Sequence, residues 1–112
     1  YALAMSHHLQ DIGVDVEDLA RKVRFEALAS HAFHPHELEV WKALEHSKDH
    51  WFKVWTTKEA VLKASGLGIR MNLNELDTRV HPLQNGGMCS HPNLGTFAYK
   101  NFQLAHVMLT VA

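Results

Sequence analysis

The sequence has few of the features that mark secreted, membrane-bound or nucleic-acid-binding chains. Cysteine occurs once, at Cys89, so no internal disulfide can form, which fits a reducing compartment such as the cytoplasm. No apolar run approaches the roughly 20 residues of a membrane span, and the first residues show no signal-peptide pattern. The 11 basic and 12 acidic side chains give a net charge of −1. We therefore expect neither a nucleic-acid nor a membrane partner.

The composition is that of an ordinary globular chain. Its 112 residues are 46% hydrophobic and 21% charged, which predicts one small domain over residues 1–112. The first residue is Tyr1 and not Met, so we expect a fragment, a processed product or the ordered part of a longer protein.

The apolar patterns predict two strands, then three helices, then three strands. The predicted strands and helices are Tyr1–Met5, Ile12–Glu17, Asp18–Ala32, Glu37–Leu44, Asp49–Ala64, Leu76–Val80, Thr96–Phe102 and Ala105–Val111, in chain order. The glycine-rich segment Gln84–Gly95 is predicted to be a loop. Such segregation predicts an α+β fold in which a mainly antiparallel sheet packs against about three helices.

The second predicted strand carries two acids at alternate positions. Because side chains two apart share a face, Asp15 and Glu17 should project together, while Val14 and Val16 point to the other face, expected to be the inner one. Adjacent carboxylates repel unless a cation lies between them, and Mg²⁺ prefers such oxygen ligands. The alternative is an ordinary strand with a solvated outer face.

The third predicted helix has a lysine inside its apolar arc. At about 100° per residue, Lys58 falls among the apolar positions, whereas Glu59 and Lys63 lie at their edge, one turn apart. A charged residue in an apolar stripe is expected mostly at functional sites. The alternatives are a snorkelling lysine and an ordinary ion pair four residues apart.

Two segments together resemble the signature motifs of the 4′-phosphopantetheinyl transferases. They are Ile12-Gly13-Val14-Asp15-Val16-Glu17 and Trp55-Thr56-Thr57-Lys58-Glu59-Ala60-Val61-Leu62-Lys63-Ala64. A Phe-x-Pro-x-Glu-like element, Phe33 to Glu37, lies between them. The spelling is more similar to the Sfp type than to the short holo-acyl-carrier-protein synthases. The resemblance implies the family's fold and transfer of the phosphopantetheine arm of coenzyme A to a carrier-protein serine, with Mg²⁺ and release of 3′,5′-ADP.

The resemblance also implies roles for individual residues. Asp15, Glu17 and Glu59 match the family's metal-binding acids, and Glu59 matches the acid that helps deprotonate the serine. Lys58 and Lys63 match lysines near the coenzyme's diphosphate, so Glu59 and Lys63 are the expected catalytic pair. The expected partners are coenzyme A and an acyl or peptidyl carrier protein, in fatty-acid, polyketide or nonribosomal peptide biosynthesis.

One departure from the family concerns the start of the chain. In the Sfp type, a Ser-His pair that touches the coenzyme lies well before the Gly-Val-Asp motif, but here Ser6-His7 lies only eight residues before Asp15. We do not assign that role to this pair. The chain resembles the C-terminal half of a two-half enzyme, without the half that binds adenine and the 3′-phosphate. The alternatives are a stand-alone synthase-like homo-oligomer and an inactive or regulatory fragment.

Other reactive residues give weaker signals. Ten histidines invite a zinc hypothesis, but apart from His46 and His50 they lack ligand spacing on a predicted helix. Cys89 stands alone in a glycine-rich segment and has no feature of a nucleophile. The aromatic residues and terminal strands supply more apolar area than one small sheet covers, which predicts a chain that needs a partner.

Overall fold

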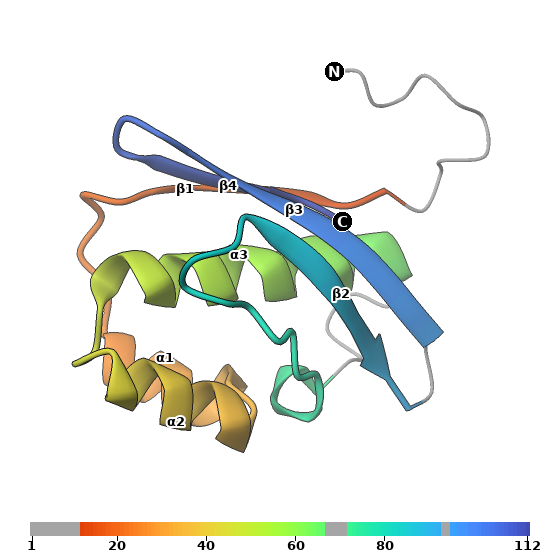
Figure 1. Ribbon diagram of the computed structural model, residues 1–112, viewed down its shortest axis with the longest axis horizontal. Helices are drawn as coiled ribbons and strands as arrows, with labels where there is room; N and C mark the ends of the chain where they lie inside the picture. The colour runs from red at the N-terminus through yellow and green to blue at the C-terminus, as the bar shows by residue number, and fades with distance from the viewer. Residues whose placement is uncertain (1–11, 67–71, 93–94) are drawn as a thin grey trace.

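The computed structural model describes residues 12–66, 72–92 and 95–112, and it has the predicted α+β architecture (Figure 1). Within these residues, four antiparallel strands form one sheet in the order β1-β4-β3-β2. The strands are β1 (Val14–Asp18), β2 (Gly86–His91), β3 (Gly95–Leu104) and β4 (Val107–Val111). The outer strand β1 therefore pairs with the last strand of the chain.

Helix α3 (Lys48–Ser65) is the centre of the molecule. It lies between the sheet and the two shorter helices, α1 (Phe25–Ala32) and α2 (Pro35–Ala43) (Figure 1). The side chain of Ser47 caps its first turn, accepting a hydrogen bond from the backbone N–H of His50 at 3.3 Å. Gly66 ends it with φ 73°, a left-handed conformation that suits glycine. No described helix is long and apolar enough to cross a membrane.

The core explains why α3 is central. Trp51, Phe52, Val54 and Val61 of α3 are almost completely buried and pack with Phe33, Trp41, Leu76 and Met108. The indole of Trp51 stacks on that of Trp55, with ring centroids 5.2 Å apart. Because α3 is covered on most sides, several of its polar residues are buried, among them Lys53 and Lys58. The helix thus carries charged groups into the interior, where each needs a partner.

The first predicted helix is much shorter than expected. It was predicted over Asp18–Ala32, but α1 begins only at Phe25. The backbone N–H of Leu19 continues the sheet by donating to His106 O at 2.7 Å, and the Asp18 side chain accepts from Ala20 N. These bonds replace the helical ones, so the prediction for the first turns was wrong. Pro35 at the start of α2 begins that helix two residues earlier than predicted.

Two predictions in the second half of the chain were also wrong. Leu76–Val80 is not a strand: the short 3₁₀ helix η4 (Leu73–Glu75) precedes it, and only Asp77 forms an isolated bridge, to Ser90. The predicted loop Gln84–Gly95 contains strand β2. Glycine and proline frequency suggested a loop, but pairing with β3 overrides local propensity. The predicted strand Tyr1–Met5 lies outside the described residues.

The faces of β1 are the reverse of the prediction. Val14 and Val16 are 39% and 52% exposed, whereas Asp15 is buried and turned toward α3. The register with β4 places Asp15 beside Thr110, which is buried and hydrogen-bonded to Thr56 of α3. The inner face of this sheet is thus partly polar. The valines belong to an apolar outer face that no described element covers.

Candidate functional site

Four residues at the junction of β1 and α3 form what we call the acid edge: Asp15, Glu17, Glu59 and Lys63. The ammonium group of Lys63 connects the two elements. It donates to the backbone oxygen of Val14 at 3.0 Å and to Asp15 Oδ1 at 3.1 Å. Lys63 is exposed and Glu59 is half-buried, so this edge is open to solvent.

Gly13 allows β1 to lie directly on α3. A Cβ atom at this position would overlap the backbone oxygen of Ala60 and lie 2.6 Å from Ala64 N. The two alanines provide a shallow surface on the helix, and the backbone of Gly13 is fixed by two hydrogen bonds with Ala112. The close contact between β1 and α3 therefore explains why the Gly-Val-Asp motif begins with glycine. The sequence identified Gly13 as part of the motif but did not predict this contact.

The charges of the acid edge are unbalanced. Burial raises the pKa of Asp15 above its ordinary value, against the lowering effect of Lys63, and Glu17 raises it further. Burial, followed by the charge of Asp15, likewise raises the pKa of Glu59. Asp15 Oδ2 is buried and has no hydrogen-bond partner. Three carboxylates and one lysine leave an excess of negative charge that a cation would relieve.

The acids are not assembled as a finished metal site. Glu17 pairs with Arg21, Oε1 to Nη1 at 2.5 Å, and Asp15 pairs with Lys63. Among the residues that the structure describes, no three His, Cys, Asp or Glu side chains are grouped closely enough to hold a metal ion. The structure thus places the predicted acids on one edge, where burial, followed by the charges of neighbouring acids, raises the pKa values of Asp15 and Glu59.

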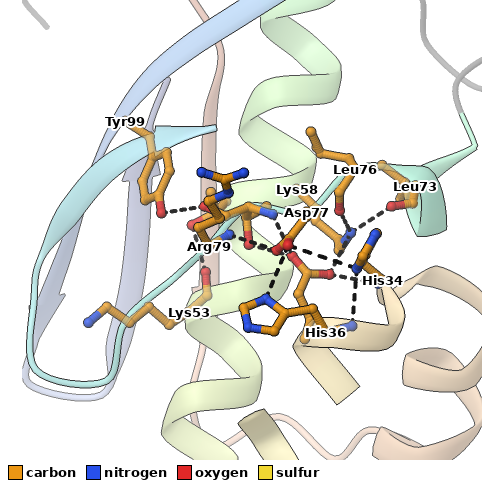
Figure 2. Close-up of polar contacts among 12 residues, drawn as sticks. His34, His36, Lys53, Lys58, Leu73, Leu76, Asp77, Arg79 and Tyr99 are labelled. Carbon is orange, nitrogen blue, oxygen red and sulfur yellow. Dashed lines mark hydrogen bonds and ion pairs between the residues drawn. The ribbon is translucent and has the colours of Figure 1, made fainter. Parts of the chain in front are cut away.

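Lys58 lies elsewhere, in what we call the buried cluster: Glu37, Lys58 and Thr78. Its side chain is 0% exposed, and its ammonium group lies 2.7 Å from Glu37 Oε1. It also donates to the backbone oxygens of Leu73 and Leu76 at 2.6 and 2.5 Å (Figure 2). An ammonium group has three N–H donors, and all three have partners here. In this arrangement none remains for a phosphate.

Glu37 is equally well satisfied. Oε1 also accepts from His34 N at 2.8 Å, and Oε2 accepts from the backbone N–H and hydroxyl of Thr78 at 2.8 and 2.5 Å. Tyr99 of β3 donates its hydroxyl to Thr78 O at 2.6 Å (Figure 2). This cluster ties α2, α3, the segment after η4 and β3 together. Its signal in the sequence was the lysine inside the apolar arc, but nothing in the spacing identified Glu37 as its partner.

His34, His36 and Cys89 belong to other parts of the described structure than the acid edge. His36 Nδ1 is 3.1 Å from Asp77 Oδ2, and His34 Nδ1 is 3.9 Å from the same oxygen (Figure 2). Cys89 is buried in β2, where burial raises the pKa of its thiol to about 11. At neutral pH the thiol is therefore protonated, which does not suit a nucleophile.

Comparison with known proteins adds to this geometry. A sequence profile described as "4′-phosphopantetheinyl transferase superfamily" matches residues 11–108. The chain is 34% identical over 93 residues to the 4′-phosphopantetheinyl transferase HetI of Nostoc, an alignment that covers 81% of this chain and 39% of HetI. It is 40% identical over 63 residues to a holo-[acyl-carrier-protein] synthase of Geotalea daltonii, covering 52% of this chain and 50% of that one. The chain thus spans half or less of these relatives.

Solved structures show the same fold. The holo-[acyl-carrier-protein] synthase of Thermotoga maritima superposes with a TM-score of 0.70 at 16% identity, covering 89% of this chain and 60% of that one. The holo-ACP-synthase of Plasmodium yoelii gives a TM-score of 0.57 at 15% identity, with 95% and 94% covered. At such identities the likeness concerns the fold. It agrees with the antiparallel sheet and three helices described above.

Proposed function

Because this chain belongs to the 4′-phosphopantetheinyl transferase superfamily, we propose that it transfers the phosphopantetheine arm of coenzyme A to a serine of a carrier protein. The names of its relatives, a 4′-phosphopantetheinyl transferase and a holo-[acyl-carrier-protein] synthase, support this reaction. The observation that carries the proposal is the acid edge, where Lys63 connects Asp15 of β1 to the turn of α3 that bears Glu59. The second product is 3′,5′-ADP.

Glu59 and Lys63 take the chemical roles in this proposal. The raised pKa of Glu59 makes its carboxylate a stronger base than an exposed one. The serine proton moves to Glu59, the serine oxygen bonds to the phosphorus that carries the pantetheine arm, and the bond from that phosphorus to the bridging oxygen breaks. The exposed ammonium of Lys63 faces the growing charge on the diphosphate, as phosphoryl transfer requires.

Asp15, Glu17 and Glu59 would hold a divalent cation, which we propose is Mg²⁺. The unpartnered Asp15 Oδ2 and the raised pKa values of Asp15 and Glu59 fit such a ligand. When bound, Mg²⁺ supplies positive charge against the diphosphate oxygens. The carboxylates must approach one another for this, with Glu17 leaving Arg21. Contact of Lys58 with the coenzyme stays a prediction, and it would require the buried cluster to open.

We further propose that a second unit of this fold covers the open face of the sheet. Its large exposed apolar side chains are Val14, Val16, Met88, Phe102 and Leu104. The register aligns Val16, Leu109 and Phe102 in one row across three strands, on the face away from α3. An N-terminal half of a longer polypeptide or a second copy would supply this cover. The intact mass of the complete protein distinguishes these alternatives. A polypeptide about twice as long as this chain would indicate an N-terminal half, and one of about this length that forms an oligomer would indicate a second copy.

The reaction is tested by loading an apo carrier protein from coenzyme A with the complete protein, followed as the mass gain of the phosphopantetheine arm. We expect loading with Mg²⁺, loss of loading on chelation and recovery when Mg²⁺ or Mn²⁺ is restored. A protein that binds carrier but transfers nothing with either ion would support the regulatory-fragment alternative. Carrier proteins of fatty-acid, polyketide and peptide biosynthesis are tested in parallel. The free, buried Cys89 is consistent with a cytoplasmic reaction.

A further inference from the structure

A row of polar side chains crosses the inner face of the sheet and ends at the acid edge. The strand register aligns Asp15 of β1 with Thr110 of β4, and Thr110 with Asn101 of β3. All three residues are buried, on the face of the sheet that packs against α3. We call them the polar row. Side chains directly opposite one another on neighbouring antiparallel strands have Cβ atoms about 4.5–5.5 Å apart, so Thr110 lies beside Asp15.

Helix α3 meets the polar row with two threonines, Thr56 and Thr57, both of which are completely buried. Thr56 Oγ1 lies 2.8 Å from Thr110 Oγ1. Thr57 Oγ1 lies 2.8 Å from the side-chain nitrogen of Asn101, and the same nitrogen lies 2.8 Å from Thr110 Oγ1. Side-chain hydrogen bonds in the interior of the molecule thus join α3 to both β3 and β4.

Every proton in this network has an acceptor. The Thr56 and Thr57 hydroxyls each donate to the backbone oxygen four residues earlier in α3, at 2.8 and 2.7 Å. The hydrogen bond between Thr56 and Thr110 therefore uses the proton of Thr110. The two threonine oxygens near Asn101 can then only accept, and they take both of its amide protons. Because these bonds all have a fixed direction, they hold the helix and the sheet in one relative position.

The acid edge begins one helical turn after this network. Glu59 follows Thr56 by three positions and Lys63 follows it by seven, which is about one and two turns of α3. Ala60, four positions after Thr56, lies against the backbone just before β1. Strands β4 and β1 therefore contact α3 at successive turns. A rotation or shift of α3 against the sheet would move Glu59 and Lys63 relative to Asp15.

We propose that Thr110 and Asn101 are positioning residues for the transfer reaction. By holding the two threonines of α3 they fix the helix on the sheet, and so the distance between the carboxylates of Asp15 and Glu59. The inference rests on the proposed function, in which these acids hold a divalent cation. Apolar side chains of similar volume would keep α3 on the sheet without fixing its rotation. Reacting groups need placement within about 0.5 Å, and a misplacement of about 1 Å can cost on the order of 10²-fold in rate.

The test compares Thr110→Val, which removes the hydroxyl and keeps the shape of the side chain, with Thr110→Ser, which keeps the hydroxyl. The first readout needs no activity: nuclear Overhauser contacts between the Hα protons of Gly13 and the amide proton of Ala64 report how closely α3 lies on β1. The second is the Kd of Mn²⁺, measured by electron paramagnetic resonance on the complete protein with coenzyme A. In Thr110→Val the contacts should weaken and the Kd should rise at least several-fold, and Thr110→Ser should restore both.

Carrier loading separates positioning from stability. The kcat of Thr110→Val should fall by about 10–100-fold while KM for the carrier stays unchanged, because only the placement of the reacting groups is altered. Val54→Ala is the matched control: Val54 is almost completely buried, and at about 100° per residue it lies on the opposite side of α3 from Thr56. This variant should unfold at a lower urea concentration but keep the wild-type contacts, Mn²⁺ affinity and kcat.

A Thr110→Val protein that is destabilised but keeps the contact between Gly13 and Ala64, the Mn²⁺ affinity and kcat would overturn the proposal. Equal losses in Thr110→Ser or in Val54→Ala would also overturn it. If Thr110→Val does not fold, Thr57→Val, which removes the hydrogen bond between α3 and β3, decides by the same readouts. A wild-type protein that loads no carrier would instead refute the proposed function, and the contact between Gly13 and Ala64 would still test the polar row.

Discussion

The buried cluster and the acid edge both involve helix α3, yet the charged groups are fully paired in the first and incompletely paired in the second. Lys58 and Lys63 are five residues apart in α3. Lys58 has three partners and no exposure, whereas Lys63 is exposed beside three carboxylates, one of which keeps an unpaired oxygen. A satisfied polar cluster fixes the fold, and an unsatisfied one leaves capacity for a ligand. We therefore assign folding to the first and chemistry to the second.

The largest expected effect comes from Glu59→Gln. It removes the proposed base and one charge of the proposed cation site while keeping the size of the side chain. Carrier loading by the complete protein should fall by about 10²–10⁴-fold, as is typical on losing a general base. The free energy of unfolding should stay the same or rise, because burial, followed by the charge of Asp15, raises the pKa of Glu59 and so disfavours its ionised form in the folded chain. Normal loading at saturating Mg²⁺ would refute the role of Glu59.

Lys58→Met tests the structural role of the buried cluster. It leaves Glu37 buried without its cation, and breaking a buried pair in this way costs about 3–5 kcal/mol. Denaturation by urea should show this loss. Glu37→Gln added to Lys58→Met removes the unpaired charge, keeps an oxygen for Thr78 and should recover part of the stability. If Lys58→Met unfolds at the wild-type urea concentration, the cluster does not have the structural role that we assign to it.

Lys63→Met is the matched variant on the acid edge. Since the ion pair with Asp15 involves an exposed lysine, stability should change by less than about 1 kcal/mol. Loading should weaken by about 10–100-fold, the range for losing hydrogen bonds to a charged group. The loss should appear in both coenzyme affinity and turnover, since these contacts strengthen as charge develops. A Lys63→Met protein with wild-type loading and a large loss of stability would contradict our assignment of chemistry to the acid edge.

The smallest expected effect is a dependence of stability on pH. Burial and like charges raise the folded pKa values of Asp15 and Glu59, so the folded chain holds these protons more tightly than the unfolded chain. The stabilisation of the folded chain by these two protonated carboxyls is fully present below their pKa values in the unfolded chain, about 3.9 and 4.3. It is lost as pH rises through their raised pKa values in the folded chain. Denaturation at pH 4 and pH 7 should therefore show Glu59→Gln gaining stability relative to wild type at the higher pH. A constant difference would contradict the raised pKa of Glu59.

The sequence predicted the fold class and the main helix because these depend on strong local patterns. Helix α3 has a capping serine, a long apolar arc and a terminal glycine, and its observed bounds differ from the prediction by one residue at each end. Strand β2 has no such pattern: its Gly86-Gly87 start is typical of a loop, and only pairing with β3 makes it a strand. The prediction of helix directly after Asp18 was wrong for the same reason: pairing within the sheet overrides the local pattern, because the backbone N–H of Leu19 donates to His106 O.

The candidate site was predicted in composition but not in geometry. Alternation in β1 placed Asp15 and Glu17 on one face, and the structure agrees, but hydrophobicity assigned the wrong face to the interior. Val14 and Val16 are exposed because no described element covers the outer face of the sheet, and Asp15 is buried on the opposite face, where Gly13 lets β1 approach α3 closely. The pairing of Lys58 with Glu37, 21 positions apart, follows from tertiary packing and has no signal in the spacing.

The most direct test of these separate roles is the location of a bound divalent cation. Mn²⁺ is added to the complete protein in the presence of coenzyme A, and paramagnetic broadening of the backbone amide signals is recorded. The account predicts strong broadening at Asp15, Glu17 and Glu59, with Glu37 and Thr78 much less affected. It also predicts that Mg²⁺ in excess restores the signals. Broadening centred on the buried cluster, or none at the acid edge with coenzyme A bound, would contradict the assignment of chemistry to that edge.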